Sequence, residues 1–275
     1  MFYFKLFRPT LAIAISALLL FMSGCGGGGG DDDKTGSTPT LPSDAVTITD
    51  ANATQVANAV LASIDSLSIV TSLKSETAAP SFQDAVNLVA NKVFKRDRRP
   101  YPVVTGVTES IDCDNIGVGS ITFTYTETET SASGTTEFNN CEFFGLTVDG
   151  SFTFSSSWNN TTGDYSDSGS GTLTYTYGSE SFTIVMELDE TGNEQTGAFS
   201  QSVSYSVTGS SVGGFLVTTT EPLIGNYFSG ELTSGQLIVE GAGGTRLRIT
   251  ITGPYEATVE LDDGSGTFVP HSTIP

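Results

Sequence analysis

Apolar and polar residues alternate with a period of two through most of this chain from residue 120 onward. In segment 120–127, SITFTYTE, the apolar side chains are Ile121, Phe123 and Tyr125, and serine, threonine or glutamate fills the other positions. The same alternation recurs in segments 171–178, 181–190, 202–207, 246–252 and 255–261. Successive side chains of a β-strand point to opposite faces of its sheet, so this pattern predicts antiparallel strands with one buried and one solvated face.

Short turn signals separate these segments, and no helical pattern lies between them. The signals are Glu190–Asn193, Val212–Gly214, Gly241–Gly244 and Asp262–Gly264, and we expect a long loop over Trp158–Gly171. Consecutive strands should therefore pair as a meander. A sheet of about ten strands with a single apolar face must curl, close on itself or be covered.

The segment before the sheet has a helical period. Val56, Val60, Ile64 and Leu67 recur at helical spacing after Asp50, which we expect to cap the helix. A second apolar stripe follows Pro80, formed by Phe82, Val86, Val89 and Val93, and it ends before Pro100. We predict a mainly β fold, in which two N-terminal helices pack on a large curved antiparallel meander sheet. A closed barrel with the helices outside is the alternative.

The amino end has the features of a secretory signal. Lys5 and Arg8 precede the apolar run Leu11–Phe21, which is too short to span a bilayer as a helix. The next four residues, Met22-Ser23-Gly24-Cys25, resemble the lipobox of bacterial envelope lipoproteins. That resemblance implies cleavage before Cys25, acylation of its sulfur and of the new amino terminus, and anchoring in a membrane. An ordinary cleaved signal with an incidental cysteine is the alternative.

These features divide the chain into five parts. We expect a signal peptide over 1–24, a lipidated cysteine with a flexible Gly- and Asp-rich tether over 25–44, a helical segment over 45–100, an antiparallel β domain over 101–270 and a tail over 271–275. Gly26 stands where enteric-type lipoproteins retained at the inner membrane carry Asp. The resemblance therefore implies the outer membrane, with the periplasmic or surface face left open.

Two cysteines are left once Cys25 is lipidated. In an oxidising envelope, Cys113 and Cys141 are predicted to form a disulfide that contributes about 3 to 4 kcal/mol of stability. Segment 113–154, with CDNIG, FNNC and GLTVDGS, resembles a pattern in uncharacterised β-rich envelope lipoproteins. That resemblance implies that the two cysteines bridge neighbouring strands, and it implies no activity. Two thiols and one histidine, His271, are too few ligands for a zinc site, so we expect no metal and no cofactor.

Charge limits the possible partners. The formal net charge is -20, which argues against nucleic acid because such partners require a basic surface. Five of the eleven basic residues cluster before the sheet, and these are Lys92, Lys95, Arg96, Arg98 and Arg99. They are a candidate contact for anionic lipid headgroups. The alternative is a helix end at which cations meet the negative pole of the helix dipole.

Several motifs suggest chemistry, and each has a simpler explanation. Gly209–Gly213 matches the serine-hydrolase pattern G-x-S-x-G, but a strand pattern follows it and His271 lies in the tail. Asp164 and Asp167, and Asp262 with Asp263, are expected in turns, with a weak calcium site as the alternative. Trp158 and Tyr165 are candidates for ligand stacking or for covering the core edge. Arg246 and Arg248 are expected to pair across strands with Glu256 and Glu260.

These observations favour a non-catalytic protein. We expect a lipid-anchored envelope protein that binds a partner or supports the outer membrane, with the membrane and an unknown envelope protein or hydrophobic ligand as its partners. A carrier of a hydrophobic or lipid ligand in a half-open barrel is the alternative. A hydrolase is a further alternative, in which acids on opposed strands, such as Glu187 with a neighbour, cleave glycosides.

Overall fold

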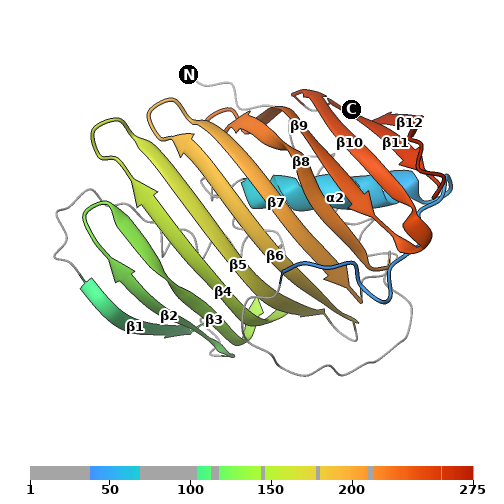
Figure 1. Ribbon diagram of the computed structural model, residues 1–275. Coiled ribbons are helices and arrows are strands. Elements are labelled where there is room, and N and C mark those ends of the chain that lie inside the picture. The colour runs from blue at the N-terminus through green and yellow to red at the C-terminus, as the bar shows by residue number, and fades with distance from the viewer. Residues whose placement is uncertain are drawn as a thin grey trace, which may run out of the picture.

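The structure is a computed structural model that describes residues 38–68, 104–112, 118–143, 146–177, 180–209, 213–254 and 256–274. This part of the chain forms one large antiparallel sheet and one α-helix, α2 (Figure 1). The strands are β1 (Val104–Asp112), β2 (Ser120–Glu127), β3 (Ser131–Phe143), β4 (Leu146–Trp158), β5 (Asp164–Tyr177), β6 (Glu180–Asn193), β7 (Ala198–Thr208), β8 (Phe215–Asn226), β9 (Glu231–Glu240), β10 (Arg246–Gly253), β11 (Glu256–Asp262) and β12 (Val269–Ile274).

The sheet is an uninterrupted meander. Its twelve described strands lie in sequence order, every neighbouring pair is antiparallel, and β1 and β12 form the two edges. The predicted mainly β meander is therefore confirmed, and the sheet is open, not a closed barrel. The six alternating segments of the sequence lie in β2, β5, β6, β7, β10 and β11.

One face of the sheet carries the hydrophobic core. On β10, for example, Leu247 and Ile249 are fully buried, whereas the residues between them keep part of their surface exposed. Helix α2 (Ala53–Ser68) packs against β10 and β11 on this face, and Val56 and Val60 join the same core. Figure 1 shows α2 crossing the strands of the C-terminal part of the sheet.

The first predicted helix is thus confirmed, and the second, over residues 81–100, lies outside the described residues. The described helix begins at Ala53, later than a cap at Asp50 would place it, and Ala53 N donates to Thr49 O. Asp50 instead contacts His271 of β12, with Oδ1 and Nδ1 3.0 Å apart, while His271 Nε2 lies 3.1 Å from Thr54 Oγ1. The histidine therefore joins the start of α2 to an edge strand. No helix in the described part is long and apolar enough to cross a membrane.

Residues 44–48, which we call the docked segment, bind the turns at one end of the sheet. Val46 N donates to Gly214 O (2.8 Å), and Ala242 N donates to Val46 O (2.7 Å). Ile48 N donates to Thr245 Oγ1 (2.9 Å), and the Ile48 side chain is 1% exposed. The docked segment therefore fastens the β7–β8 turn to the β9–β10 turn.

A repeated hairpin turn closes the other end of the sheet. The β4–β5, β6–β7 and β8–β9 connections each begin with asparagine and end with glycine four residues later, at 159–163, 193–197 and 226–230. In each turn the asparagine Oδ1 accepts from the backbone N–H groups two and three residues ahead, and the glycine N donates to the asparagine O. Each glycine has a positive φ, between 70° and 77°, which is why no other residue fits there comfortably.

These turns are also joined to one another by asparagine side chains. Asn193 Nδ2 donates to Thr162 O (2.9 Å) of the preceding hairpin, and Asn226 Nδ2 donates to Thr196 O (2.8 Å). The sequence pattern N-x-x-[ST]-G thus produces a rim of linked turns, which we call the hairpin rim.

Two strand boundaries predicted from the sequence were wrong. The expected loop over Trp158–Gly171 is only five residues long (159–163), and β5 already begins at Asp164. The expected turn at Glu190–Asn193 belongs to β6, whose turn starts at Asn193. Gly and Asp are depleted in β-strands in general. In β5 and β6 such residues stay extended because both strands are paired along their length with a neighbour on each side.

Candidate functional site

The extra strand length places four polar side chains in one line across the buried face. Ser156 of β4 lies opposite Asp167 of β5, Asp167 lies opposite Glu190 of β6, and Glu190 lies opposite Gln201 of β7. We call these four residues the polar row. Directly opposed residues in a sheet have Cβ atoms about 5 Å apart, so the side chains can contact one another.

Hydrogen bonds connect the polar row to a neighbouring tyrosine. Tyr165 Oη donates to Glu190 Oε1 at 2.6 Å, and Gln201 Nε2 donates to Glu190 Oε2 at 3.0 Å. Ser156 Oγ donates to an oxygen of Asp167. In each of these three hydrogen bonds the acceptor is therefore a carboxylate of the polar row.

One acceptor in the polar row is left over. Gln201 is 0% exposed, and its Oε1 has no hydrogen-bond partner within the described part of the chain. A buried amide oxygen without a donor costs about 1 to 3 kcal/mol, so native proteins seldom leave one without a reason.

Burial also changes the acidity of the site. Burial, more than any other cause, raises the pKa of Glu190 to about 6, and the negative charge of Asp167 adds to the rise. The hydrogen bonds from Tyr165 and Gln201 oppose it by stabilising the carboxylate. The pKa of Tyr165 is raised in turn by burial and by the Glu190 charge, so its hydroxyl keeps its proton and acts as a donor.

Larger side chains border the polar row on both sides. Towards the hairpin rim, Trp158, Tyr165 and Phe199 occupy the next row, and Gly192 lies between the last two. A Cβ on Gly192 would lie 2.5 Å from Tyr165 Oη, so this glycine makes room for the tyrosine hydroxyl. Towards the core, the adjoining row contains Phe154, Leu188 and Val203. The carboxylates are thus set between an aromatic row and an apolar row.

The row is reached from solvent through its middle. Ser156 and Gln201 are buried, at 2% and 0% exposure, whereas Asp167 and Glu190 keep part of their surface exposed. Trp158 is also half-buried, and Tyr165 is 9% exposed. Asp167 and Glu190 therefore place two acid side chains at the part of the row that reaches solvent.

Several residues singled out from the sequence lie outside the described residues. These are Cys25, Lys92, Lys95, Arg96, Arg98, Arg99 and Cys113. Cys141 is fully buried in β3, and its predicted bond to Cys113 stays a prediction. Trp158 and Tyr165 face each other across β4 and β5, and ligand stacking on them likewise stays a prediction.

The G-x-S-x-G motif is placed between two strands. The chain leaves β7 at Thr208 and enters β8 at Phe215, so the strand-to-helix turn that a serine nucleophile requires is not formed there. Glu187 lies between Ser170 and Ser204 on the solvated face and has no acid opposite it. The acid pair on opposed strands is Asp167 with Glu190 instead.

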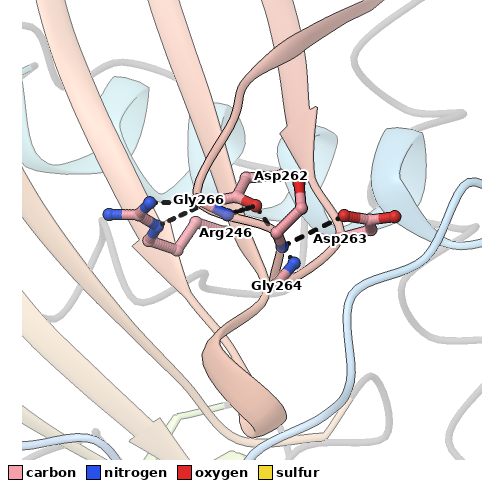
Figure 2. Close-up of polar contacts among 6 residues, drawn as sticks. Arg246, Asp262, Asp263, Gly264 and Gly266 are labelled. Atoms are coloured by element: carbon pink, nitrogen blue, oxygen red, sulfur yellow. Dashed lines mark hydrogen bonds and ion pairs between the residues drawn. The ribbon is translucent and has the colours of Figure 1, made fainter.

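A second polar cluster joins β10, β11 and the turn that follows (Figure 2). Asp262 Oδ2 accepts from Arg246 Nε (3.1 Å) and from an Arg246 terminal nitrogen (2.5 Å), and its Oδ1 accepts from the N–H groups of Gly264 and Gly266. The Arg246 guanidinium lowers the pKa of Asp262. Because the ion pair and the turn N–H groups occupy both oxygens, we interpret the cluster as structural, and the predicted turn role of Asp262 is confirmed.

The neighbouring ion pair follows the expected cross-strand pattern in part. Arg248 Nε donates to Glu260 Oε2 at 2.6 Å, as predicted, but Arg246 pairs with Asp262 and not with Glu256. Both guanidinium groups lie over the ring of Phe268, at 5.0 and 4.5 Å from its centroid.

Asp164, which the sequence analysis named as an alternative calcium ligand, accepts hydrogen bonds from Thr162 Oγ1 and Asn193 Nδ2 in the hairpin rim.

The sequence analysis did not predict the polar row, although the alternation of apolar residues places its members on the buried face. Glu190 continues the series Ile184, Met186 and Leu188, and Gln201 precedes Val203, Tyr205 and Val207 at the same spacing. Extending each alternating run by one or two steps places the row on the buried face. The signal is weak because serine, glycine and acid side chains are also typical of turns.

No protein-family model, no curated protein and no solved structure matches this chain. The site must therefore be interpreted from its own chemistry.

Proposed function

We propose that this chain is a lipid-anchored, non-catalytic protein of the bacterial outer membrane whose sheet binds a small amphiphilic ligand at the polar row. The polar row is the observation that carries the binding role. A mostly buried carboxylate with a raised pKa, Glu190, and a buried amide oxygen of Gln201 that has no hydrogen-bond partner in the described part of the chain both reduce stability, and such groups are concentrated at sites that bind something. An amphiphile matches both the carboxylates and the apolar and aromatic rows beside them.

The anchor rests on the sequence alone. The lipobox-like Met22–Cys25 follows an apolar signal, and the docked segment lies a short distance along the chain from it. That segment joins the sheet at the end opposite the hairpin rim, so an anchored domain would hold the rim away from its point of attachment.

Metabolic labelling tests the anchor. We expect labelled palmitate to be incorporated into the full-length protein and to be lost in Cys25→Ser, with Cys141→Ser as a variant that keeps the label. Equal labelling of Cys25→Ser and the unmodified chain would show that the sulfur of Cys25 is not the anchor.

Mass spectrometry tests the binding role. We expect protein that is purified from membranes in mild detergent, and then washed free of loosely associated lipid, to retain nearly one molecule of a small amphiphile per chain. Asp167→Asn combined with Glu190→Gln should release that molecule, whereas Glu187→Gln on the solvated face should keep it. Purified protein with no bound amphiphile, and no uptake of one in solution, would contradict the proposal.

A hydrolase is the second candidate, and the Asp167–Glu190 pair is the observation that favours it. Two opposed acids, one with a raised pKa, are the minimum that glycoside hydrolysis requires. We place it second because Glu190 is held by Tyr165 and Gln201 at both oxygens. Turnover of chromogenic glycosides that is lost in Glu190→Gln would reverse this order.

A further inference from the structure

Three polar side chains meet where the start of α2 contacts the edge strand β12. His271 Nε2 lies 3.1 Å from Thr54 Oγ1, and His271 Nδ1 lies 3.0 Å from Asp50 Oδ1. We call these three residues the Thr54 triad. The triad lies apart from the polar row, whose members belong to β4, β5, β6 and β7, so its chemistry is independent of the binding function proposed above.

The two contacts of the histidine ring determine the direction of both hydrogen bonds. A carboxylate only accepts hydrogen bonds, so His271 Nδ1 carries a proton and donates to Asp50. In the neutral ring Nε2 is then an acceptor, and the Thr54 hydroxyl donates to it. A hydroxyl that donates to an imidazole, with a carboxylate orienting that imidazole, is the arrangement in which proteins activate an oxygen nucleophile.

Exposure differs among the three side chains in a way that suits this chemistry. The His271 side chain is 12% exposed, the Asp50 side chain is 92% exposed, and Thr54 is also exposed. The ring is therefore held against the start of α2, while the hydroxyl is open to a molecule that arrives from solvent. His271 is the only histidine of the chain.

Backbone N–H groups at the start of α2 add donors beside the hydroxyl. Ala53 N donates to Thr49 O, whereas within the described part of the chain no acceptor is assigned to the N–H groups of Thr54 and Gln55. The first N–H groups of a helix have no partner inside the helix, and they form its positive pole. A negative charge that develops on an oxygen next to Thr54 Oγ1 would be stabilised by these groups.

We infer that Thr54 is a site of covalent acylation, at which Thr54 Oγ1 takes an acyl group from a carboxylic ester. Thr54 Oγ1 attacks the ester carbonyl carbon while its proton passes to His271 Nε2, and Asp50 holds the proton on Nδ1. The bond between the carbonyl carbon and the leaving oxygen then breaks, and that oxygen takes the proton from Nε2. The products are an ester on Thr54 and a free alcohol, and each chain accepts a single acyl group.

The chromogenic ester p-nitrophenyl butyrate tests the assignment, because transfer of its acyl group releases a coloured phenolate. The full-length protein is incubated with the ester in mildly alkaline buffer, phenolate release is followed by absorbance, and the acylated residue is located by peptide mass spectrometry. We expect a burst of phenolate that ends after one equivalent, with the butyryl group on Thr54. Peptide mapping separates this label from butyryl groups on lysine side chains.

Variants connect the label to the triad. Thr54→Ser should keep the burst, and Thr54→Val should lose it. His271→Gln should slow acylation of Thr54 at least about a hundredfold, and Asp50→Asn at least about tenfold. Thr49→Val is the matched control, because it removes an exposed hydroxyl of the same turn that contacts Asn52 and not the histidine. Far-ultraviolet circular dichroism shows whether each variant is folded, and the exposed position of Asp50 makes Asp50→Asn the variant least expected to unfold.

Three outcomes would overturn the inference. The first is a protein that carries no butyryl group on Thr54. The second is an equal rate of Thr54 acylation in the unmodified chain and in both His271→Gln and Asp50→Asn. Neither result would affect amphiphile binding at the polar row. The third is phenolate release that continues after the first equivalent and is lost in Thr54→Val, which would make the chain a hydrolase and would contradict its proposed non-catalytic role as well.

Discussion

Glu190 shows how a single buried acid couples this fold to pH. Its carboxylate faces the core beside Asp167, and two hydrogen bonds compensate for only part of the lost hydration. The ionised form of the Glu190 side chain therefore lowers the free energy of unfolding. Such a group contributes most to stability when it is protonated.

We predict that this disadvantage can be measured as a pH dependence of unfolding. Because the pKa of Glu190 rises from 4.5 to about 6 on folding, the folded chain keeps a proton that the unfolded chain loses in this window. Stability should fall by about 2 kcal/mol as pH rises through the window. In Glu190→Gln this part of the profile should be flat, as urea unfolding at a series of pH values would show.

A matched variant isolates the effect from the other acids of the chain. Glu187→Gln removes one negative charge from the same strand but from the solvated face. Its stability profile should keep the fall between pH 4.5 and 6. Identical profiles for the two variants would contradict the buried position of Glu190.

At the scale of elements, the hairpin rim and the docked segment hold the two ends of the sheet. The rim is built from local rules, since each turn needs asparagine at its start and glycine at its end. The docked segment depends on contacts far along the chain, between residues 44–48 and the turns near 214 and 245.

We predict that Gly197→Ala destabilises the β6–β7 hairpin. Its φ of 74° disfavours any side chain, and an added Cβ would lie 2.4 Å from Phe228 Cδ2. The expected cost is about 1 to 2 kcal/mol in thermal or urea unfolding. Gly253→Ala is the control, because a Cβ there meets nothing within 4 Å and its backbone is extended. An equal effect of the two changes would contradict the turn geometry.

The docked segment should contribute to global stability and not only to order at the amino end. Ile48 is 1% exposed in the main core, so Ile48→Ala should lower the free energy of unfolding by about 2 to 5 kcal/mol. Thr47→Ala, at the exposed neighbouring position, should have little effect. A loss that is confined to local hydrogen exchange near residue 48, with the unfolding midpoint unchanged, would show that the segment is peripheral.

At the scale of the whole molecule, the sheet is held by strand pairing in sequence order and by one described helix. Among the described strands, β1 pairs with β2 alone. The end of β1 comes level with Asn139 of β3 through the pairs Asp112–Ser120 and Ser120–Asn139. Strands two apart lie about 10 Å from each other, too far for a disulfide between straight strands. β2 begins only at Ser120, and Glu142 N donates to Val118 O (3.3 Å), so the chain that enters β2 passes beside Cys141.

We predict that the bond between Cys113 and Cys141 stabilises this edge. Cys113→Ser should lower stability by about 3 to 4 kcal/mol in the chain-entropy model, and a reductant should lower that of the unmodified chain equally. The reductant should have no effect on Cys113→Ser. Alkylation of both thiols in the native, unreduced protein would overturn the pairing.

The sequence by itself determined the class of fold and the faces of most strands. Ile121 and Phe123, or Leu247 and Ile249, alternate with polar residues because one face of a sheet must be removed from water, and this requirement is local and visible. Topology followed from the lack of helical patterns between the strands.

Only the tertiary structure decided where strands end and which polar residues turn inward. Asp167 and Glu190 resemble turn residues in the sequence, and they are held in strands because neighbours on both sides satisfy their backbone groups. His271 and Asp50 meet although they are far apart in the chain. Such pairings depend on the register of the whole sheet, which no short window of sequence contains, and the polar row exists only once that register has aligned four strands.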